Sequence, residues 1–348
     1  MRVEIATRSR WAENRNARLE RIKASPLWAG ERFRNLHPVI PGLRDANASM
    51  PTISDFLCGG ERRFPRGPLP SMNPLEAWNK APASGLRATW LGHSTVLIEI
   101  DGLRVLTDPV WGPRASPSRL AGPKRFQPVP VPLRAMPPVD LVIVSHDHYD
   151  HLDYPTIREL VRRDVPFVTS LGVGAHLEAW GVGPTRIVEL DWWESHTLPN
   201  TELTVTAAPS QHFSGRGLHD RNATLWSSMV IRSQRHAVFF SGDTGLTTEY
   251  QTIRERLGPF DLVMLEVGAF HLAWGDIHLG PNNRITSFQR PSRNLNACST
   301  PMAAVTGVYP PSLLSGEYLT FSCVLVISPA YRHLSSCAIA VARTSIES

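Results

Sequence analysis

The sequence predicts an α/β protein in which helices cover the faces of a β-sheet. Short apolar segments of strand length recur from residue 88 onward, and the first three are close enough together to form hairpins. From residue 139 such segments alternate with stretches of helical length. Polar residues follow the ends of several predicted strands, where α/β folds place their chemistry. With 348 residues, 42% of them hydrophobic, the chain can bury a sizeable core.

The elements are assigned in chain order from their apolar content and length. Strands are expected at Ala88–Leu91, Thr95–Ile100, Arg104–Thr107, Val139–Val144, Pro166–Thr169, Arg186–Leu190, Leu203–Ala208, Ser228–Ile231, Ala237–Ser241 and Leu262–Glu266. Helices are expected at Tyr154–Arg163, Val173–Trp180 and Thr247–Leu257, with a short one near residues 11–23. Residues 112–138 contain eight prolines and are expected to form a long surface loop, which is usually a functional segment.

Composition divides the chain into three parts. Residues 1–85 are rich in Pro, Arg and Asn and predict an irregular N-terminal extension, whereas residues 86–281 carry the regular elements. Residues 282–348 hold only two of the 31 acidic residues but eleven serines. In this part only the apolar run Leu319–Ile327 could form a strand. The last part is therefore an atypical tail, and whether it is native to the domain is open.

Charge and cysteine content restrict the partners and the compartment. Residues 1–35 hold nine Lys or Arg and four Glu, within a chain of net charge +5. Such an arm can contact anionic lipid or nucleic acid, but a solvated helix explains it equally well. No nucleic-acid-binding motif accompanies it, so no nucleic-acid partner is expected. The four cysteines form no CxxC pair, which favours a reducing cytoplasmic compartment.

Membrane contact is expected to be peripheral at most. The chain has no apolar stretch of about 18 residues, and its N-terminus lacks the apolar segment of a secretory signal. Whether identical chains associate into an oligomer is left open.

The most informative motif is the run His146-Asp147-His148-Tyr149-Asp150-His151, which follows the predicted strand Val139–Val144. Imidazole and carboxylate groups are suitable ligands for Zn²⁺ and similar ions. Since side chains alternate in an extended segment, His146 and His148 point the same way and can bind one ion. Asp150 and His151 lie beyond the strand and can reach a second ion. The spacing HxHxDH therefore predicts a two-metal hydrolytic centre.

Five other polar residues also lie just past predicted strands or in a glycine-bordered loop. They are His93, Asp108, His212, Asp243 and His278. We expect His93 and Asp108 to orient metal ligands through hydrogen bonds. His212 and Asp243 are weak signals singly, because such residues are common on surfaces and in turns. Their order after HxHxDH makes them specific.

The ligand order resembles that of the metallo-β-lactamase superfamily. The surrounding segments are similar to those of the N-acylphosphatidylethanolamine-hydrolysing phospholipase D family and its bacterial relatives. They are TWLGHSTVLIE (89–99), LTDPVWGPRASPS (106–118), GPKRF (122–126), SHDHYDHLDY (145–154), ELDWWE (189–194), PSQH (209–212), SGDTG (241–245) and GPFDL (258–262). The resemblance runs from about Ala88 to Pro281. It implies a metallo-β-lactamase-like αββα sandwich, two mixed sheets flanked by helices, with a hydrolase domain over residues 86–281.

The resemblance also implies the chemistry. The ligands of the first zinc would be His146, His148 and His212, those of the second Asp150 and His151, and Asp243 would bridge the two ions. A metal-bound hydroxide would attack the phosphorus of a phospholipid diester, releasing N-acylethanolamine and phosphatidic acid. Asp150 and His278 would be the catalytic residues. Tyr149 and His278 would lie near the substrate phosphate.

The chain departs from the family pattern at one ligand. The family carries a further histidine ligand of the second zinc in a segment reading HWGTF, and this chain has no such segment. The change falls near Gly280–Asn282, where the composition also shifts, and a frameshift or recombination would explain it. The resemblance thus implies two zinc ions with an impaired second site.

Two alternatives to the phosphodiesterase remain. One is a cytoplasmic lactonase or small phosphate-ester hydrolase on the same scaffold, and the other is an inactive metal-binding remnant. An exposed apolar patch beside the metals, formed by Trp111, Phe126 and Trp192, would favour a lipid over a small substrate. Trp192 and Trp193 fit the core equally well, and one of the two is expected there. A serine hydrolase has little support, because the sequence has no GxSxG motif.

Overall fold

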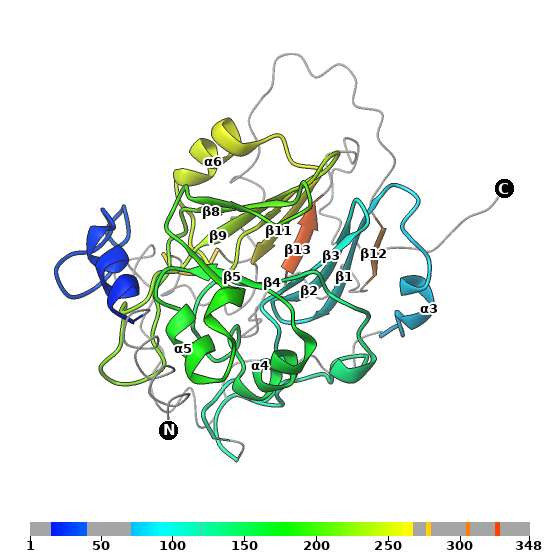
Figure 1. Ribbon diagram of the computed structural model, residues 1–348, viewed down its shortest axis with the longest axis horizontal. Helices are drawn as coiled ribbons and strands as arrows, with labels where there is room; N and C mark the ends of the chain where they lie inside the picture. Colours follow the sequence, from blue (N-terminus) through cyan, green and yellow to red (C-terminus); the bar gives the residue numbers. More distant parts are fainter. Residues whose placement is uncertain are drawn as a thin grey trace, which may run out of the picture.

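Two mixed β-sheets stack face to face, and helices cover their outer faces (Figure 1). The computed structural model describes residues 15–39, 71–118, 120–266 and 276–279, together with strands at residues 304–306 and 324–327. Most of the predicted tail and residues 1–14 and 40–70 of the predicted extension lie outside the described residues. The expected αββα architecture is confirmed.

The first sheet has seven strands in the order β12-β1-β2-β3-β4-β5-β6. Their bounds are β1 Leu86–Gly92, β2 Thr95–Ile100, β3 Leu103–Thr107, β4 Leu141–Val144, β5 Phe167–Ser170, β6 Ile187–Leu190 and β12 Ala304–Thr306. Strands β1 to β3 form antiparallel hairpins, and β3 to β6 run parallel. The parallel half aligns the carboxyl ends of β3 and β4, from which several site residues follow.

The second sheet has six strands in the order β13-β11-β10-β9-β8-β7. Their bounds are β7 Ser195–Thr197, β8 Thr204–Ala208, β9 Ser228–Arg232, β10 Ala237–Phe240, β11 Leu262–Glu266 and β13 Val324–Ile327. Only β10 and β11 pair in parallel. Strand β13 lies inside the apolar run that we expected to form a strand, and it pairs antiparallel with β11. The short strands β7 and β12 were not predicted.

The helices are short and lie on the outer faces of the sheets. They are α3 Leu75–Trp78, α4 Tyr154–Leu160, α5 Gly174–Ala179 and α6 Glu249–Leu257, with 3-10 turns η1 Leu133–Ala135, η2 Val161–Arg163 and η3 Pro184–Arg186. Helix α4 begins where the Asp153 carboxylate accepts a hydrogen bond from the Thr156 backbone N–H, with Pro155 in the first turn. In Figure 1, α6 covers one side of the sandwich, while α4 and α5 cover the other.

Alternating side chains of single strands reach two different cores. In β4, Leu141 and Ile143 join the cluster between the two sheets, whereas Val142 and Val144 join the cluster under α4 and α5. Both faces of this strand are therefore buried, which explains its unbroken apolar sequence. A third cluster packs Phe239 of β10 against α6. These layers fix the strand ends from which the site residues extend.

The N-terminal segment packs against the domain through an aromatic cluster. Residues 15–24 are helical. The buried members of the cluster are Ile22, Leu27, Phe33, Leu171, Trp192, Leu225 and Trp226. The Arg18 guanidinium pairs with both Glu178 and Glu189. Of the two interpretations left open for Trp192, the structure supports the core, because its ring is buried in this cluster and its indole N–H donates to the Trp226 carbonyl oxygen.

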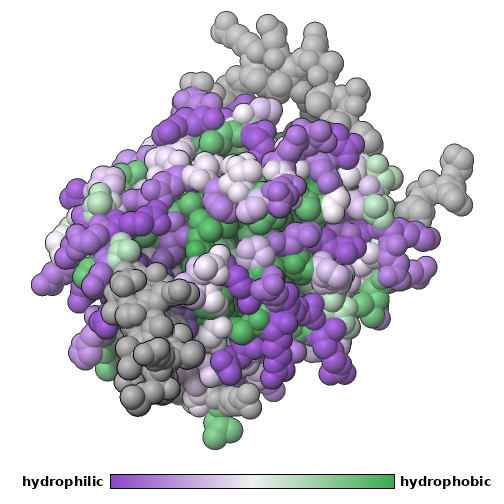
Figure 2. All heavy atoms as spheres, in the orientation of Figure 1, coloured by the Kyte–Doolittle hydropathy of each residue, from purple (hydrophilic) through white to green (hydrophobic). Residues whose placement is uncertain are grey.

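Hydrophilic side chains cover most of the face shown in Figure 2, and apolar ones are visible near its centre. Among the described residues, no helix is both long and apolar enough to cross a bilayer.

Candidate metal centre

The predicted ligands come together on loops that follow the ends of strands in both sheets. His146, His148, Asp150 and His151 follow β4 directly, His212 follows β8, and Asp243 follows β10. The turn before Asp243 needs glycine, because Gly242 has a φ of 55° and an added Cβ would lie 2.8 Å from the Ser145 Cβ. The two sheets thus place their loops against each other at one end of the sandwich.

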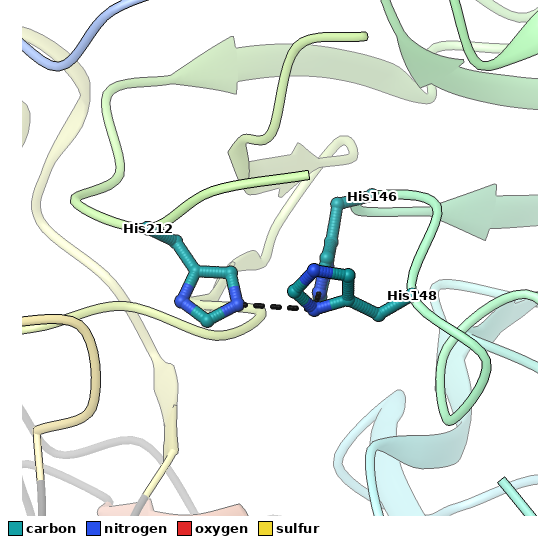
Figure 3. A group of neighbouring side chains, drawn as sticks. All are labelled: His146, His148 and His212. Atoms are coloured by element: carbon teal, nitrogen blue, oxygen red, sulfur yellow. Dashed lines mark hydrogen bonds between the residues drawn. The ribbon is translucent and has the colours of Figure 1, made fainter. Parts of the chain in front are cut away.

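Three histidine side chains converge in the arrangement shown in Figure 3. His146 Nε2 lies 3.0 Å and His212 Nε2 lies 3.3 Å from His148 Nδ1. A single proton on His148 Nδ1 cannot form hydrogen bonds to both of the other nitrogens. Ligand nitrogens about 2.0–2.1 Å from a tetrahedral Zn²⁺ are about 3.3 Å apart, which is close to the observed spacing. The three nitrogens therefore fit one metal ion.

In His212 and His146, the ring nitrogen that faces away from His148 is held by the protein. The His212 Nδ1 lies 2.9 Å from the Ile277 carbonyl oxygen, an acceptor that fixes this nitrogen as protonated. The His146 Nδ1 lies 2.9 Å from the Ser145 hydroxyl. This arrangement leaves the Nε2 of each ring unprotonated and available to bind a metal.

A second group lies beside the first. His151 Nε2 is 3.2 Å from Asp243 Oδ2, and His93 Nε2 is 3.0 Å from Asp150 Oδ2. The ligand atoms of His93, Asp150 and His151 lie within 4.8 Å of one another. Asp243 Oδ2 is also 3.8 Å from His212 Nε2, so this carboxylate faces both groups. His93 was expected only to orient ligands, but its ring nitrogen is itself close enough to bind an ion.

Unsatisfied polar atoms within the described residues also fit a metal. His93 Nε2, His151 Nε2 and Asp243 Oδ1 are buried and form no well-aligned hydrogen bond there, although the two nitrogens lie close to the carboxylates of Asp150 and Asp243. Leaving a buried polar atom without a well-aligned partner costs about 1–3 kcal/mol, and cations bound among these side chains would offset that cost.

Asp108 holds the second group in place. Its carboxylate accepts hydrogen bonds from the Ser145 backbone N–H and hydroxyl and lies 2.7 Å from His151 Nδ1. Because Asp108 accepts at Nδ1, the Nε2 of His151 is directed toward Asp243. Asp108 and His93 adopt φ values of 36° and 55°, and such strained backbone concentrates at functional sites.

The two ligand groups differ in the protonation of their histidines. Burial and the neighbouring histidines hold the pKa of His146 well below its usual range, so its ring is neutral. Burial opposes the charge on His151, but the carboxylates of Asp243, Asp150 and Asp108 outweigh it and raise the pKa of His151 well above its usual value. Without a metal, a proton on His151 therefore balances the carboxylates.

Glu266 is a site residue that the sequence analysis missed. It ends β11, is completely buried, and accepts a hydrogen bond at Oε2 from the Leu279 backbone N–H. Its Oε1 lies 3.4 Å from His278 Nδ1, and that nitrogen is 3.9 Å from Asp243 Oδ2. The carboxylate thus holds the His278 loop against the predicted ligands.

Replacing Glu266 by glutamine is expected to change how stability depends on pH. Burial raises the pKa of Glu266 to about 7 from its ordinary value of 4.5. The folded protein therefore binds this proton more tightly than the unfolded chain, and the free energy of unfolding falls as pH rises from 4.5 to 7. Metal-free Glu266→Gln should exceed the wild type by on the order of 3 kcal/mol above pH 7, and by little near pH 4. Urea unfolding across this range measures the difference.

Exposed Glu255 gives the matched control. The Glu255→Gln variant should track the wild type at every pH. A Glu266→Gln variant whose stability keeps a constant offset from the wild type would contradict the expectation.

A cavity of about 330 Å³ opens beside the second group. It is lined by His93, His148, Tyr149 and Asp150 together with apolar side chains that include Trp90, Leu91, Val110 and Phe126. Residues of the proline-rich 112–138 loop form one wall, as expected of a functional loop. The Tyr149 hydroxyl donates to the Arg216 carbonyl, so its ring is fixed in the wall. Trp111 lines a neighbouring hollow instead.

Asn35 reaches the site from the N-terminal segment. Its amide donates to the His212 carbonyl oxygen at 2.8 Å and accepts from the His212 N–H at 3.1 Å. An isolated asparagine in a segment without periodicity carries no sequence signal for this contact. It becomes recognisable only when the segment packs on the domain.

Several known proteins and one family of domains are similar to this chain. The family described as the beta-lactamase superfamily domain matches residues 103–292. An uncharacterised protein of Mycobacterium tuberculosis is 45% identical over 262 residues, which is 75% of this chain and 69% of that protein. N-acyl-phosphatidylethanolamine-hydrolyzing phospholipase D 1 of Caenorhabditis elegans is 39% identical over 212 residues, 58% of this chain and 60% of that protein. Among solved structures, a metallo-hydrolase of the archaeon Ignicoccus hospitalis matches with a TM-score of 0.45 and 22% identity over 58% of this chain and 76% of that one.

Proposed function

Because the chain belongs to the β-lactamase superfamily of metal-dependent hydrolases, we propose that it is a zinc-dependent phosphodiesterase of phospholipids. Its substrate would be an N-acylphosphatidylethanolamine, cleaved to N-acylethanolamine and phosphatidic acid. The observation that carries the proposal is the pair of buried ligand groups at the side of a largely apolar cavity. Such a cavity suits an acyl chain better than a sugar phosphate.

In this proposal His146, His148 and His212 would hold one zinc ion, Asp150 and His151 would hold the other, and Asp243 would contribute to both sites. Zinc would activate water near neutral pH and would supply positive charge for the phosphoryl oxygens. The protein's own contribution is to position the diester. His278, fixed by Glu266, steadies the phosphate and the leaving oxygen, and the ring of Tyr149 forms the cavity wall beside Asp150.

His93 is a candidate to replace the further histidine ligand that the family carries in its HWGTF segment. Its buried Nε2 is directed at Asp150 and lies in one group with His151. With Asp243, these residues offer two nitrogens and two carboxylates, a ligand set that suits zinc. We therefore propose that His93 completes the second site.

Zinc content and lipid hydrolysis together test the function. Zinc-loaded protein dialysed against metal-free buffer should retain about two zinc ions per chain and release N-acylethanolamine from N-acylphosphatidylethanolamine in mixed micelles. The His93→Gln variant should retain about one. His236→Gln is the matched control, because this histidine pairs with Asp101 away from the site.

Other outcomes select the alternatives. Two zinc ions with turnover of a lactone but not of the phospholipid would favour the lactonase. One zinc ion in the wild type and no turnover of either substrate would indicate an inactive remnant. Two ions in the His93→Gln variant would exclude His93 as a ligand.

A further inference from the structure

Arg125 is a half-buried cation, with its Nε fully buried, in the wall of the cavity that opens beside the ligand groups. It follows Lys124 in the proline-rich loop, and its Nη2 donates to the Val110 carbonyl oxygen at 2.7 Å. Its Nη1 lies over Gly92, 2.6 Å from where a Cβ would be. The guanidinium therefore lies beside the backbone of Gly92, the residue before His93, and lines the same cavity as His93, His148 and Asp150.

The guanidinium has no carboxylate partner among the described residues. Its Nε is buried without any hydrogen bond there, and its one hydrogen bond is to a neutral carbonyl. The acidic side chain that attracts it electrostatically is Asp153, whose carboxylate already accepts hydrogen bonds from the Gly112 and Thr156 N–H groups. Burial accordingly lowers the pKa of Arg125. A cation desolvated without a counter-charge is costly, and an anionic ligand would offset that cost.

The other side chains of the cavity wall indicate which chemical group the ligand carries besides its anion. Trp90, Leu91, Val110 and Phe126 present apolar surface within the same cavity. A ligand that matches both features carries an anionic oxygen beside Arg125 and a hydrocarbon chain along the apolar wall. Arginine suits phosphoryl oxygens in particular, since its planar fork can donate two parallel hydrogen bonds.

We propose that Arg125 binds a non-bridging phosphoryl oxygen of an amphiphilic phosphate ligand whose chain lies along the apolar wall. This specificity role deepens the proposed function and rests on it for the identity of the substrate. In this role Arg125 favours a charged diester over a neutral ester, and it is separate from the residues that would bind metal.

Ligand binding tests the role without turnover. Isothermal titration of the zinc-loaded full chain would use hexylphosphonate, inorganic phosphate and the neutral dimethyl ester of hexylphosphonate. The wild type should bind hexylphosphonate at least about tenfold more tightly than inorganic phosphate, because the chain buries apolar surface. Arg125→Gln should weaken hexylphosphonate binding about 10-fold to 100-fold and leave the neutral ester within about twofold. Arg125→Lys should fall between the two.

Lys124→Gln is the matched control, since it removes the same charge from an exposed neighbour and should change neither affinity by more than about twofold. Equal losses for the charged and the neutral ligand would show that Arg125 only shapes the cavity and would overturn the proposal. Equal wild-type affinity for hexylphosphonate and inorganic phosphate would overturn the apolar part. If these binding results hold while phospholipid turnover is absent, the proposed function fails and the anion site stands.

Discussion

Replacing Asp243 by asparagine is expected to lower kcat/KM for phosphodiester hydrolysis about 1,000-fold, which corresponds to about 4 kcal/mol of transition-state stabilisation. The carboxylate is buried and its Oδ2 faces His151 at 3.2 Å and His212 at 3.8 Å. An amide keeps the shape but loses the negative charge between the two groups. Its NH₂ would also face ring nitrogens that must stay unprotonated to bind metal.

Metal content should change with the activity. The three-histidine group does not depend on Asp243, so the Asp243→Asn variant should keep about one zinc ion per chain and lose the second. Burial opposes the charge on Asp243, but the surrounding histidines outweigh it and depress the pKa of this carboxyl, so the wild type is ionised across the neutral range.

The Asp140→Asn variant is the control, because this exposed carboxylate only accepts the Arg104 N–H outside the site. It should match the wild type in zinc content and turnover. An Asp243→Asn variant within tenfold of wild-type activity, or one with two zinc ions, would show that this carboxylate does not lie between the metals.

Replacing Asp108 by alanine is expected to lower the free energy of unfolding by about 3–5 kcal/mol. Three donors lose their acceptor at once, namely the Ser145 N–H, the Ser145 hydroxyl and His151 Nδ1. Since all three are buried, water does not replace the carboxylate. Alanine at a φ of 36° adds backbone strain. Denaturant unfolding of the metal-free variant measures the loss.

The Asp108→Asn variant separates stability from orientation. Its side-chain oxygen can still accept from Ser145, so most of the stability should remain. Its amide cannot accept from His151 Nδ1, which then favours the tautomer that blocks Nε2. We expect the affinity for the second zinc ion to fall about 10-fold to 100-fold. Wild-type zinc affinity in Asp108→Asn would mean that this hydrogen bond does not set the tautomer.

Sequence patterns located the central elements of the fold accurately. The bounds of β2 and β11 are those predicted, because each is a mainly apolar segment of strand length with polar or turn residues next to it. Strand β7 was missed because Ser195–Thr197 has no apolar alternation and forms only through pairing with β8. Such a strand is stabilised by its neighbour, which local sequence does not report.

The site residues also differ in whether the sequence alone could predict their positions. The alternation argument correctly placed His146 and His148 side by side, since it needs only the geometry of one extended segment. The approach of His212 and Asp243 could be expected only from their order along the chain and from the family resemblance. The surroundings of Glu266 and Arg125, which single out these two residues, form only when distant segments pack together.

The contact between Asn35 and both backbone groups of His212 couples two equilibria. Docking of the N-terminal segment restricts the loop that carries a predicted metal ligand, so a docked segment favours an ordered ligand set. By thermodynamic reciprocity, any ion that orders His212 must strengthen docking of the segment by the same factor. Metal occupancy would then be read out far from the ion, as protection of residues 15–39 from proteases and from hydrogen exchange.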